Sequence, residues 1–418
     1  MSAQRIKRHR GRRLFFLLVL ALVLSPQRTS TRAQSDSQPP EGAVDLGTGL
    51  YVREDDDLVV EDTPSIRFTR TYRNADSRSR AFGIGTNHPY NAFLVGDNTA
   101  FSWAALITAD GGSIHYVRIS PGSTLASAVF EHTATPSEFY KSRLTWNGRA
   151  WEIILRDGSR YWFSAYTGKE SGRCGMIGYR DSQGRALGMR CDGAGNLISI
   201  STPNRRGIKL TYDASNRITR ARTHFGRVVH VVNYEYDARG RLIKVRRIYV
   251  DIVGVLIQLV ARLFGLPVPD EIARYDETME YAYDDLHQMV RIREPGIVIT
   301  NRYRDDRVVK QMLGNGETFK FDYVLNSQRS IIQTDVTRED GSVRRVTFNA
   351  DGYAVSDTYA LGTSRQRAII YTRQAGSNRV LMVTLMCSPT RPPMKITAPL
   401  TPGERLDEAD PQWLQRCE

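Results

Sequence analysis

Residues 208–247 read IKLTYDASNRITRARTHFGRVVHVVNYEYDARGRLIKVRR and contain the same unit twice. The segment Tyr212–Ile218 recurs 24 residues later as Tyr236–Leu242. In each copy an alternating strand leads into a polar turn and then a second strand. The aspartate after the tyrosine suits hydrogen bonds to backbone N–H groups two residues on, and the following Asn or Gly tolerates the left-handed backbone of a tight turn. The stretch therefore predicts a repeated β-hairpin.

Further copies lie upstream and downstream at spacings of 12 to 27 residues, with one gap of 47 residues between Tyr236 and Tyr283. A unit that cannot bury its own apolar face must stack on its neighbours, so the copies predict one continuous sheet. The residues that define the repeats are Tyr179, Asp181, Asp192, Tyr212, Asp213, Tyr234, Tyr236, Asp237, Gly240, Tyr283, Asp284, Tyr303 and Asp305.

The unit Tyr-x-Tyr-Asp-x-x-Gly-Arg-Leu, complete at Tyr234–Leu242, resembles the YD repeat of the RHS (rearrangement hotspot) family. Upstream, Ala43–Gly49, Phe68–Tyr72 and a glycine-aromatic segment ending at His88–Tyr90 resemble the domain that precedes the repeats in these proteins. The resemblance, over residues 43–385, implies an all-β fold with an N-terminal β domain and a curved antiparallel sheet. We find neither the family's core-end motif nor a toxin domain. We therefore expect a short member with an open sheet.

The N-terminus has the features of an export signal. A basic start precedes the apolar residues 14–24 and a small-x-small cleavage pattern, so the mature chain is expected in the periplasm, at the cell surface or outside the cell. Contact with a membrane is expected only through an uncleaved signal. The expected parts are a signal peptide (1–33), a linker (34–42), an N-terminal β domain (43–170), the YD-repeat sheet (171–385) and a Pro-rich C-terminal tail (386–418).

One segment breaks the strand pattern. Residues 250–265 read VDIVGVLIQLVARLFG, with non-apolar residues three and four apart, which predicts an amphipathic helix at about 249–266. The apolar face of such a helix must be buried against another part of the protein or a partner. We favour a helix lying across the inner face of the repeat sheet, and the alternative is a docking site for a partner or a membrane surface.

The chain has four cysteines, Cys174, Cys191, Cys387 and Cys417. In an exported protein they favour disulfides. Neighbouring hairpins hold the first two and the C-terminal tail lies between the last two, which favours the pairs Cys174–Cys191 and Cys387–Cys417. Free or buried thiols are an equally weighted alternative.

No pattern of catalytic, cofactor-binding or metal-binding residues emerges, so we predict a protein that is not an enzyme and has no cofactor. The net charge is +13, but eight basic residues lie within 1–33, which leaves only +5 for the rest and indicates no nucleic-acid partner. The acidic run Glu54–Asp57 is interpreted as a solvated turn in preference to a calcium site.

Three functions are considered. The first is an exported, non-catalytic binding scaffold that presents the aromatic-lined concave face of its sheet to a carbohydrate or a polypeptide. The second is an accessory or remnant shell component of an RHS-type toxin system, in which a partner polypeptide completes the open sheet edge. The third is a hydrolase of the cell wall or of a polysaccharide.

Overall fold

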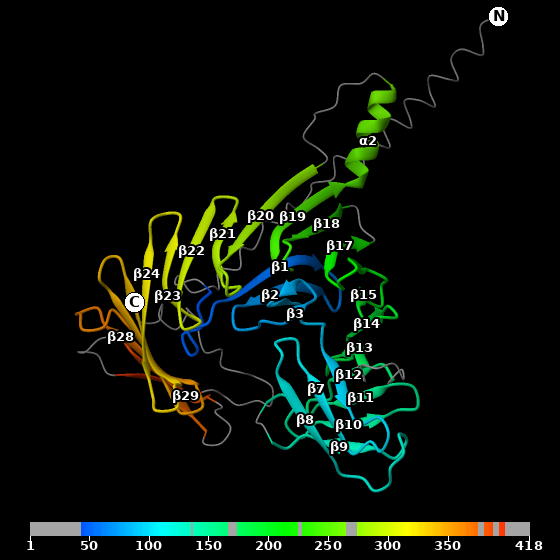
Figure 1. Ribbon diagram of the computed structural model, residues 1–418, viewed down its shortest axis with the longest axis horizontal. Helices are drawn as coiled ribbons and strands as arrows, with labels where there is room; N and C mark the ends of the chain where they lie inside the picture. Colours follow the sequence, from blue (N-terminus) through cyan, green and yellow to red (C-terminus); the bar gives the residue numbers. More distant parts are fainter. Residues whose placement is uncertain are drawn as a thin grey trace, which may run out of the picture. The chain divides into compact units, whose positions relative to one another are not determined.

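The computed structural model describes residues 43–134, 137–165, 174–224, 228–264, 274–374, 380–387 and 393–397. These residues form the strands β1 to β30 and the helix α2 (Figure 1). The predicted signal peptide, the linker and most of the C-terminal tail lie outside them. In the described part of the chain, no helix is long and apolar enough to cross a bilayer. The predicted all-β class is confirmed.

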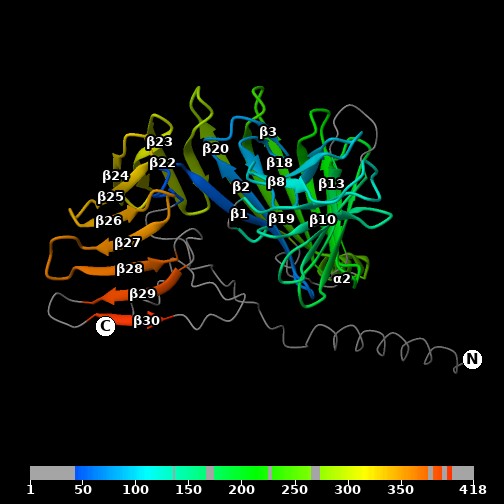
Figure 2. The ribbon, with the colours of Figure 1, turned by 90° about the horizontal axis from the view of Figure 1, so that it is seen from below.

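The repeats form one antiparallel meander in which each strand pairs with its neighbours in the chain. Figures 1 and 2 show the row of strands bending between β14 and β30. Within the described residues β30 has register partners only in β29, and the predicted curved antiparallel sheet of repeats is confirmed. Its strands are β14 (Ala186–Cys191), β15 (Leu197–Ser201), β16 (Gly207–Tyr212), β17 (Ile218–His224), β18 (Val228–Tyr236), β19 (Leu242–Asp251), β20 (Arg274–Tyr283), β21 (Met289–Glu294), β22 (Ile297–Arg304), β23 (Arg307–Leu313), β24 (Thr318–Leu325), β25 (Ile331–Arg338), β26 (Val343–Phe348), β27 (Ala354–Tyr359), β28 (Arg367–Arg373), β29 (Val380–Met386) and β30 (Met394–Thr397).

A short local turn explains why these hairpins form. After β18, the carboxylate of Asp237 accepts hydrogen bonds from the backbone N–H groups of Arg239 at 3.0 Å and Arg241 at 2.9 Å. Gly240 has a φ of +83°, which glycine adopts without steric cost. The matching turn position also has a positive φ at Gly184, Gly195, Asn216, His287, Arg329 and Gly352. The turn chemistry predicted from the repeat is therefore present.

Upstream of the repeats, the strands β6 to β13 close into a ring. Closure depends on a fork in β13, because Cys174 and Gly175 pair with β6 whereas residues 178–180 pair with β14. The ring is filled by buried apolar side chains such as Leu144 and Phe163. Its strands are β6 (Phe93–Gly96), β7 (Trp103–Ile107), β8 (Ser113–Arg118), β9 (Val129–Glu131), β10 (Arg143–Trp146), β11 (Trp151–Ile154), β12 (Arg160–Phe163) and β13 (Cys174–Arg180).

The first strands form a separate small sheet in the order β1 (Val52–Val60), β2 (Ile66–Arg73) and β5 (Thr86–Asn87). Two short strands, β3 (Ser79–Arg80) and β4 (Gly83–Ile84), pair with each other beside it. The range 43–170, expected as one domain, thus contributes both this sheet and most of the ring.

The predicted helix is present as α2 (Ile252–Leu263). Its expected position across the inner face of the repeat sheet is wrong. The helix continues from the end of β19, beyond the strand ends (Figure 1). Among its described side chains, Val255, Leu259 and Leu263 are 42%, 56% and 74% exposed. The inner face beside β17 and β18 is instead contacted by β1.

Candidate functional site

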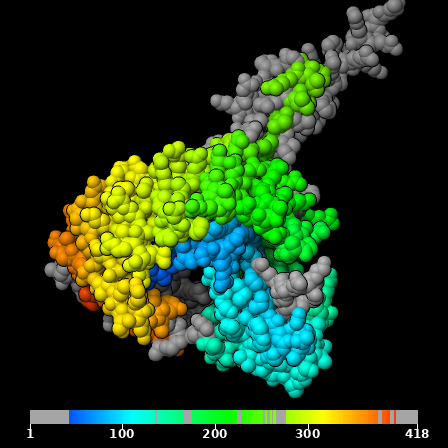
Figure 3. Space-filling view, in the orientation of Figure 1, coloured from blue at the N-terminus to red at the C-terminus, as the bar shows by residue number. Residues whose placement is uncertain are grey.

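A single N-terminal segment, residues 43–62, crosses the inner face of the repeat sheet, and we call it the clasp. Figures 1 and 3 show its strand, in blue, on the inner side of the green and yellow repeats. In β25 the Thr334 hydroxyl donates to a clasp carbonyl oxygen at 2.6 Å, and in β23 the Val308 N–H donates to another at 2.9 Å. At the opposite end Asn204, between β15 and β16, donates to the carboxylate of Asp62 at 2.7 Å. The clasp therefore connects repeats from β15 to β25.

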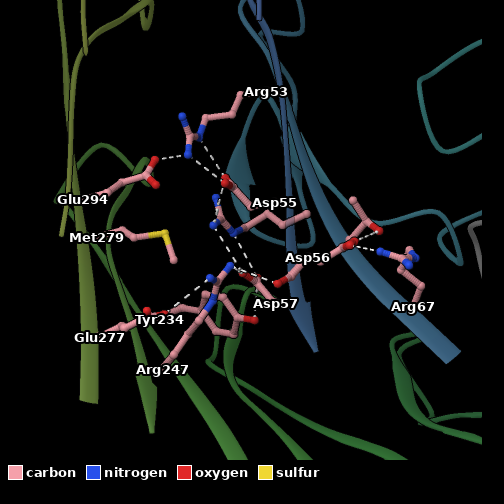
Figure 4. A network of polar contacts seen from close by, with 12 residues as sticks. Arg53, Asp55, Asp56, Asp57, Arg67, Tyr234, Arg247, Glu277, Met279 and Glu294 are labelled. Carbon is pink, nitrogen blue, oxygen red and sulfur yellow. Dashed lines mark hydrogen bonds and ion pairs between the residues drawn. The ribbon is translucent and has the colours of Figure 1, made fainter. Parts of the chain in front are cut away.

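The centre of the clasp holds a buried ion network with β2 (Figure 4). The Arg70 side chain is only 1% exposed, and its Nε lies 3.0 Å from Oδ2 of Asp57, whose side chain is fully buried. The Nη2 atom of Arg70 also lies 3.2 Å from Oδ2 of Asp55. A buried charge is costly unless it is paired and hydrogen-bonded, so these three residues stabilise one another only as a group.

Two arginines extend this network onto the repeat sheet. Arg247 of β19 places Nη2 3.2 Å from Oδ1 of Asp57 and Nη1 3.9 Å from Oε2 of Glu277. From the clasp, Arg53 forms an ion pair with Glu294 at the end of β21. The network thus joins the clasp to two repeat hairpins by charged contacts that water reaches poorly.

The electrostatics of the network favour the charged forms. Burial alone would raise the pKa of Asp55, but the guanidinium groups of Arg53 and Arg70 hold that pKa below its ordinary value. Burial alone would lower the pKa of Arg70, and the carboxylate of Asp57 instead raises it well above the ordinary value. Mutual compensation of this kind keeps buried ion pairs charged at neutral pH.

The first tyrosine of each Tyr-x-Tyr-Asp unit reaches this network. Tyr234 donates its hydroxyl to Oδ2 of Asp57 at 2.8 Å, and Tyr281 accepts a hydrogen bond from Nη2 of Arg70 at 3.0 Å. Both tyrosines are buried. Sequence-distant repeats therefore hold the clasp through equivalent positions of the repeat.

The second tyrosine of the unit holds neighbouring strands together. This tyrosine donates its hydroxyl, at 2.5 to 2.8 Å, to a backbone carbonyl oxygen at the start of the preceding strand. Tyr323, which does not hold this position of the unit, makes the same kind of bond at 2.6 Å. We call this row the tyrosine ladder. Its donor and acceptor pairs are Tyr212 with Leu197, Tyr236 with Ile218, Tyr283 with Leu242, Tyr303 with Met289, and Tyr323 with Val308.

The turn arginines add a contact between consecutive units. Arg217 forms an ion pair with Asp213 at 2.8 Å, and its guanidinium carbon lies 4.6 Å from the ring centre of Tyr236. Arg241 is placed in the same way, 5.3 Å from the ring centre of Tyr283. A guanidinium over an aromatic face is attractive, so the turn of one unit stabilises the tyrosine of the next.

The structure brings most repeat-defining residues into these roles. The carboxylates of Asp181, Asp192, Asp213 and Asp284 accept turn hydrogen bonds as that of Asp237 does. Two residues differ. Tyr179 packs on Tyr161 of the ring, with ring centres 4.9 Å apart, and Asp305 lies in a two-residue turn with a φ of +50°.

Of the two predicted cysteine pairs, only Cys174–Cys191 can be compared with the described residues. Cys191 is a thiol, whose Sγ donates to the Met176 carbonyl oxygen at 4.0 Å, so the predicted Cys174–Cys191 disulfide is absent from the structure. Cys387 is half of a disulfide. Because Cys417 lies outside the described residues, the pair Cys387–Cys417 stays a prediction.

The expectation of a solvated turn at Glu54–Asp57 is wrong. These residues lie within β1, and Asp55 and Asp57 face the arginines of the network. The sequence did contain a signal for the ion network. In the amphipathic strand Ile66–Arg73, Arg70 lies on the face that is buried, and a buried arginine requires an anionic partner. Among the described residues, no group of His, Cys, Asp and Glu could hold a metal ion.

Two family models match the chain. Residues 41–116 match a domain of unknown function (DUF6531), which includes the clasp and β2, and residues 212–248 match the RHS Repeat. The second match covers two units that have both the aspartate turn and the ladder tyrosine. The chain therefore contains RHS repeats. In this RHS-repeat protein the tyrosines and aspartates of the repeat unit thus link neighbouring strands, form the turns and bind the clasp.

Similar solved structures include a Photorhabdus luminescens Tc holotoxin pore, at 9% identity and a TM-score of 0.27, covering 80% of this chain and 24% of that chain. Another is TcdB2-TccC3 without its hypervariable C-terminal region, at 14% identity and a TM-score of 0.26, covering 76% and 16%. The RHS-repeat protein spans about a quarter or less of those chains. No curated protein matches it.

Proposed function

We propose that this RHS-repeat protein is an exported, non-catalytic scaffold: a wall segment of an RHS-type toxin system that holds a polypeptide. The match of residues 212–248 to the RHS Repeat supports the toxin-system setting.

The observation that carries the proposal is the use of the repeat residues. The tyrosine hydroxyls are occupied by backbone carbonyl oxygens and by the ion network, and the turn carboxylates are occupied by backbone N–H groups. Such residues build a rigid surface. They favour an architectural role over an arrangement of reactive groups.

A carbohydrate bound along the repeat tyrosines receives no support. Stacking on a sugar requires an accessible ring, whereas Tyr234 and Tyr281 are only 4% and 5% exposed. Their inner face is contacted by the clasp and β2. A polypeptide therefore fits the repeat sheet better, since an unpaired sheet edge offers N–H and C=O groups to an added strand.

The described part of the chain offers such an edge at β30, which pairs on one side with β29. Met394 of β30 is 42% exposed and suits the attachment of a photo-crosslinking side chain. Ile297, 49% exposed at the start of β22 within the sheet, gives a matched control position.

The test is photo-crosslinking in the native cell followed by mass spectrometry. We expect Met394 to capture a defined RHS or toxin polypeptide at high yield and Ile297 to capture none. Co-purification of polysaccharide without a polypeptide would instead support the carbohydrate-binding alternative. Polysaccharide hydrolysis that is lost on replacing one acidic residue would support the enzyme alternative.

A further inference from the structure

A cavity of about 320 Å³ lies where the ring meets the repeat sheet. Its origin is the fork of β13, because β6 and β14 pair with successive parts of one edge of this strand and then diverge. The cavity is bounded by the ring at Phe93 and Gly175, by the segment after β2 at Tyr90, and by the turns of the first repeats at Asn196 and Asn216. Its volume lies at the lower end of the range for small-molecule sites.

The polar groups of this junction cavity are mostly neutral. Asn196 donates to the Asn216 carbonyl oxygen at 2.8 Å and to Asp192 at 3.1 Å, which orients both amides. Both side-chain N–H groups of Asn196 are thereby used. The structure gives no partner within the described residues to the side-chain oxygen of Asn196 or to the side-chain NH2 group of Asn216. One amide thus offers an acceptor and the other offers a donor. No carboxylate is among the residues that line the cavity.

Aromatic rings supply the apolar walls. The hydroxyl of Tyr90 donates to the Arg67 carbonyl oxygen at 3.0 Å, and that of Tyr212 donates to the Leu197 carbonyl oxygen at 2.7 Å. These bonds fix the positions of the two rings, both of which line the cavity. The one cationic side chain in the lining, Arg80, is held by Asp76 at 2.7 Å.

We propose that the junction cavity binds one sugar unit of a neutral glycan. Sugar hydroxyls both donate and accept hydrogen bonds, which matches the amide oxygen of Asn196 and the amide donor of Asn216, and the C–H face of a sugar ring packs on an aromatic face. This site is separate from the polypeptide-binding edge at β30, so the inference goes beyond the proposed function. Failure of sugar binding would leave the proposed polypeptide binding unaffected.

A peptide fits the cavity less well. Extended peptides bind by adding a strand to a free edge. Beside the cavity, β13 pairs with β12 on one edge and with β6 and β14 on the other. A site whose backbone edges are paired must recognise its ligand through side chains, as the glycan proposal requires.

Gly175 provides a direct test. A Cβ at this position meets only ordinary contacts, the nearest being Sγ of Cys191 at 3.5 Å, and Gly175→Phe therefore directs a ring toward the cavity lining. Gly188 of β14 is the matched control, because its Cβ would also lie 3.5 Å from its nearest neighbour and it does not line the cavity. Asn216→Gly removes an amide while keeping a residue suited to the φ of +58°.

The measurement is saturation-transfer NMR on the purified chain with methyl glucoside, methyl galactoside, methyl mannoside and N-acetylglucosamine, and with the peptide Gly-Asn-Ser as a comparison. We expect at least one sugar to bind the wild type and Gly188→Phe equally. Gly175→Phe and Asn216→Gly should each lose about tenfold or more in affinity. Unchanged binding in both variants, preference for the peptide, or no sugar binding at millimolar concentration would overturn the proposal.

Discussion

Tyr234 and Asp57 lie 177 residues apart in the sequence, yet the tyrosine hydroxyl donates to the aspartate carboxylate at 2.8 Å. Tyr234 begins the fully matched repeat, and Asp57 lies in the strand that crosses the sheet. The contact therefore joins the two parts of the chain that the two family models match separately. We infer that the clasp and the repeats form one folding unit.

Removing Arg70 should destabilise this unit strongly. Arg70→Met leaves Asp55 and Asp57 buried beside each other with fewer cations, and breaking a buried ion pair from one side costs about 3–5 kcal/mol. The free energy of unfolding, measured in urea, should fall by that amount. Arg67→Met is the control, because Arg67 is 62% exposed and its pair with Asp56 is worth at most about 1 kcal/mol. Equal losses in the two variants would show that the network does not anchor the clasp.

The tyrosine ladder should contribute one hydrogen bond per unit. Tyr283→Phe removes the hydroxyl that donates to the Leu242 carbonyl oxygen at 2.7 Å, and loss of such a bond costs about 1 kcal/mol. Tyr353→Phe is the control, because this tyrosine is 40% exposed and lies outside the ladder. Urea denaturation of both variants measures the difference. A ladder without energetic value would give the same midpoint for both.

The repeats could be predicted from the sequence because their determinants are local. Asp237 and Gly240 fix a turn within four residues, and the alternation of apolar residues assigns the strand faces. The helix α2 was predicted for the same reason, since its period is visible within its own segment. The sequence of the helix does not show which part of the protein it contacts, and its position across the inner face of the sheet was therefore predicted wrongly.

The clasp and the ring could not be predicted in this way. Asp57 is compensated by Arg70 and Arg247, which are 13 and 190 residues away, and a β-bulge between Asp56 and Leu58 changes the strand register at the network. Without those partners four consecutive acidic residues indicate a solvated turn. Ring closure likewise depends on the pairing of Cys174 with Leu94, a contact between distant segments that no local pattern marks.

Gly83 contacts the repeat turn at Gly240 so closely that we expect any side chain at position 83 to destabilise the protein. This residue has a φ of +82°, and a Cβ there would lie 2.2 Å from the Gly240 carbonyl oxygen, which accepts the Ile84 N–H at 3.1 Å. Gly83→Ala therefore combines backbone strain of about 1–2 kcal/mol with a clash. Gly352→Ala is the control, because it has the same φ and open space around its Cβ.

Both variants carry the same backbone strain, so the difference between their unfolding free energies measures the effect of the close contact between Gly83 and Gly240. We expect Gly83→Ala to lose more unfolding free energy than Gly352→Ala and to show faster hydrogen exchange at the Ile84 amide, whose acceptor is displaced. Similar stability together with an unchanged Ile84 amide would mean that the segment adapts without losing its contact with the repeat.

Acid should destabilise the fold through His88. Burial lowers the pKa of His88 to about 3 from an ordinary value of 6.5, and its ring packs against Phe68 with centres 5.1 Å apart. The unfolded chain binds a proton at this histidine below pH 6.5, whereas the folded chain does so only near pH 3. Stability from the neutral form is therefore complete above pH 6.5 and falls by about 1.4 kcal/mol per pH unit as the pH drops toward 3.

His88→Phe should remove this slope, because phenylalanine keeps the aromatic packing and has no proton to bind. Urea denaturation at pH 7 and pH 4.5 measures it, and we expect the wild type to lose about 2–3 kcal/mol more than the variant over that interval. His115→Phe, at an exposed position, is the control and should keep the wild-type slope. Parallel pH profiles for the wild type and His88→Phe would show that protonation of the buried histidine does not cause the loss of unfolding free energy in acid.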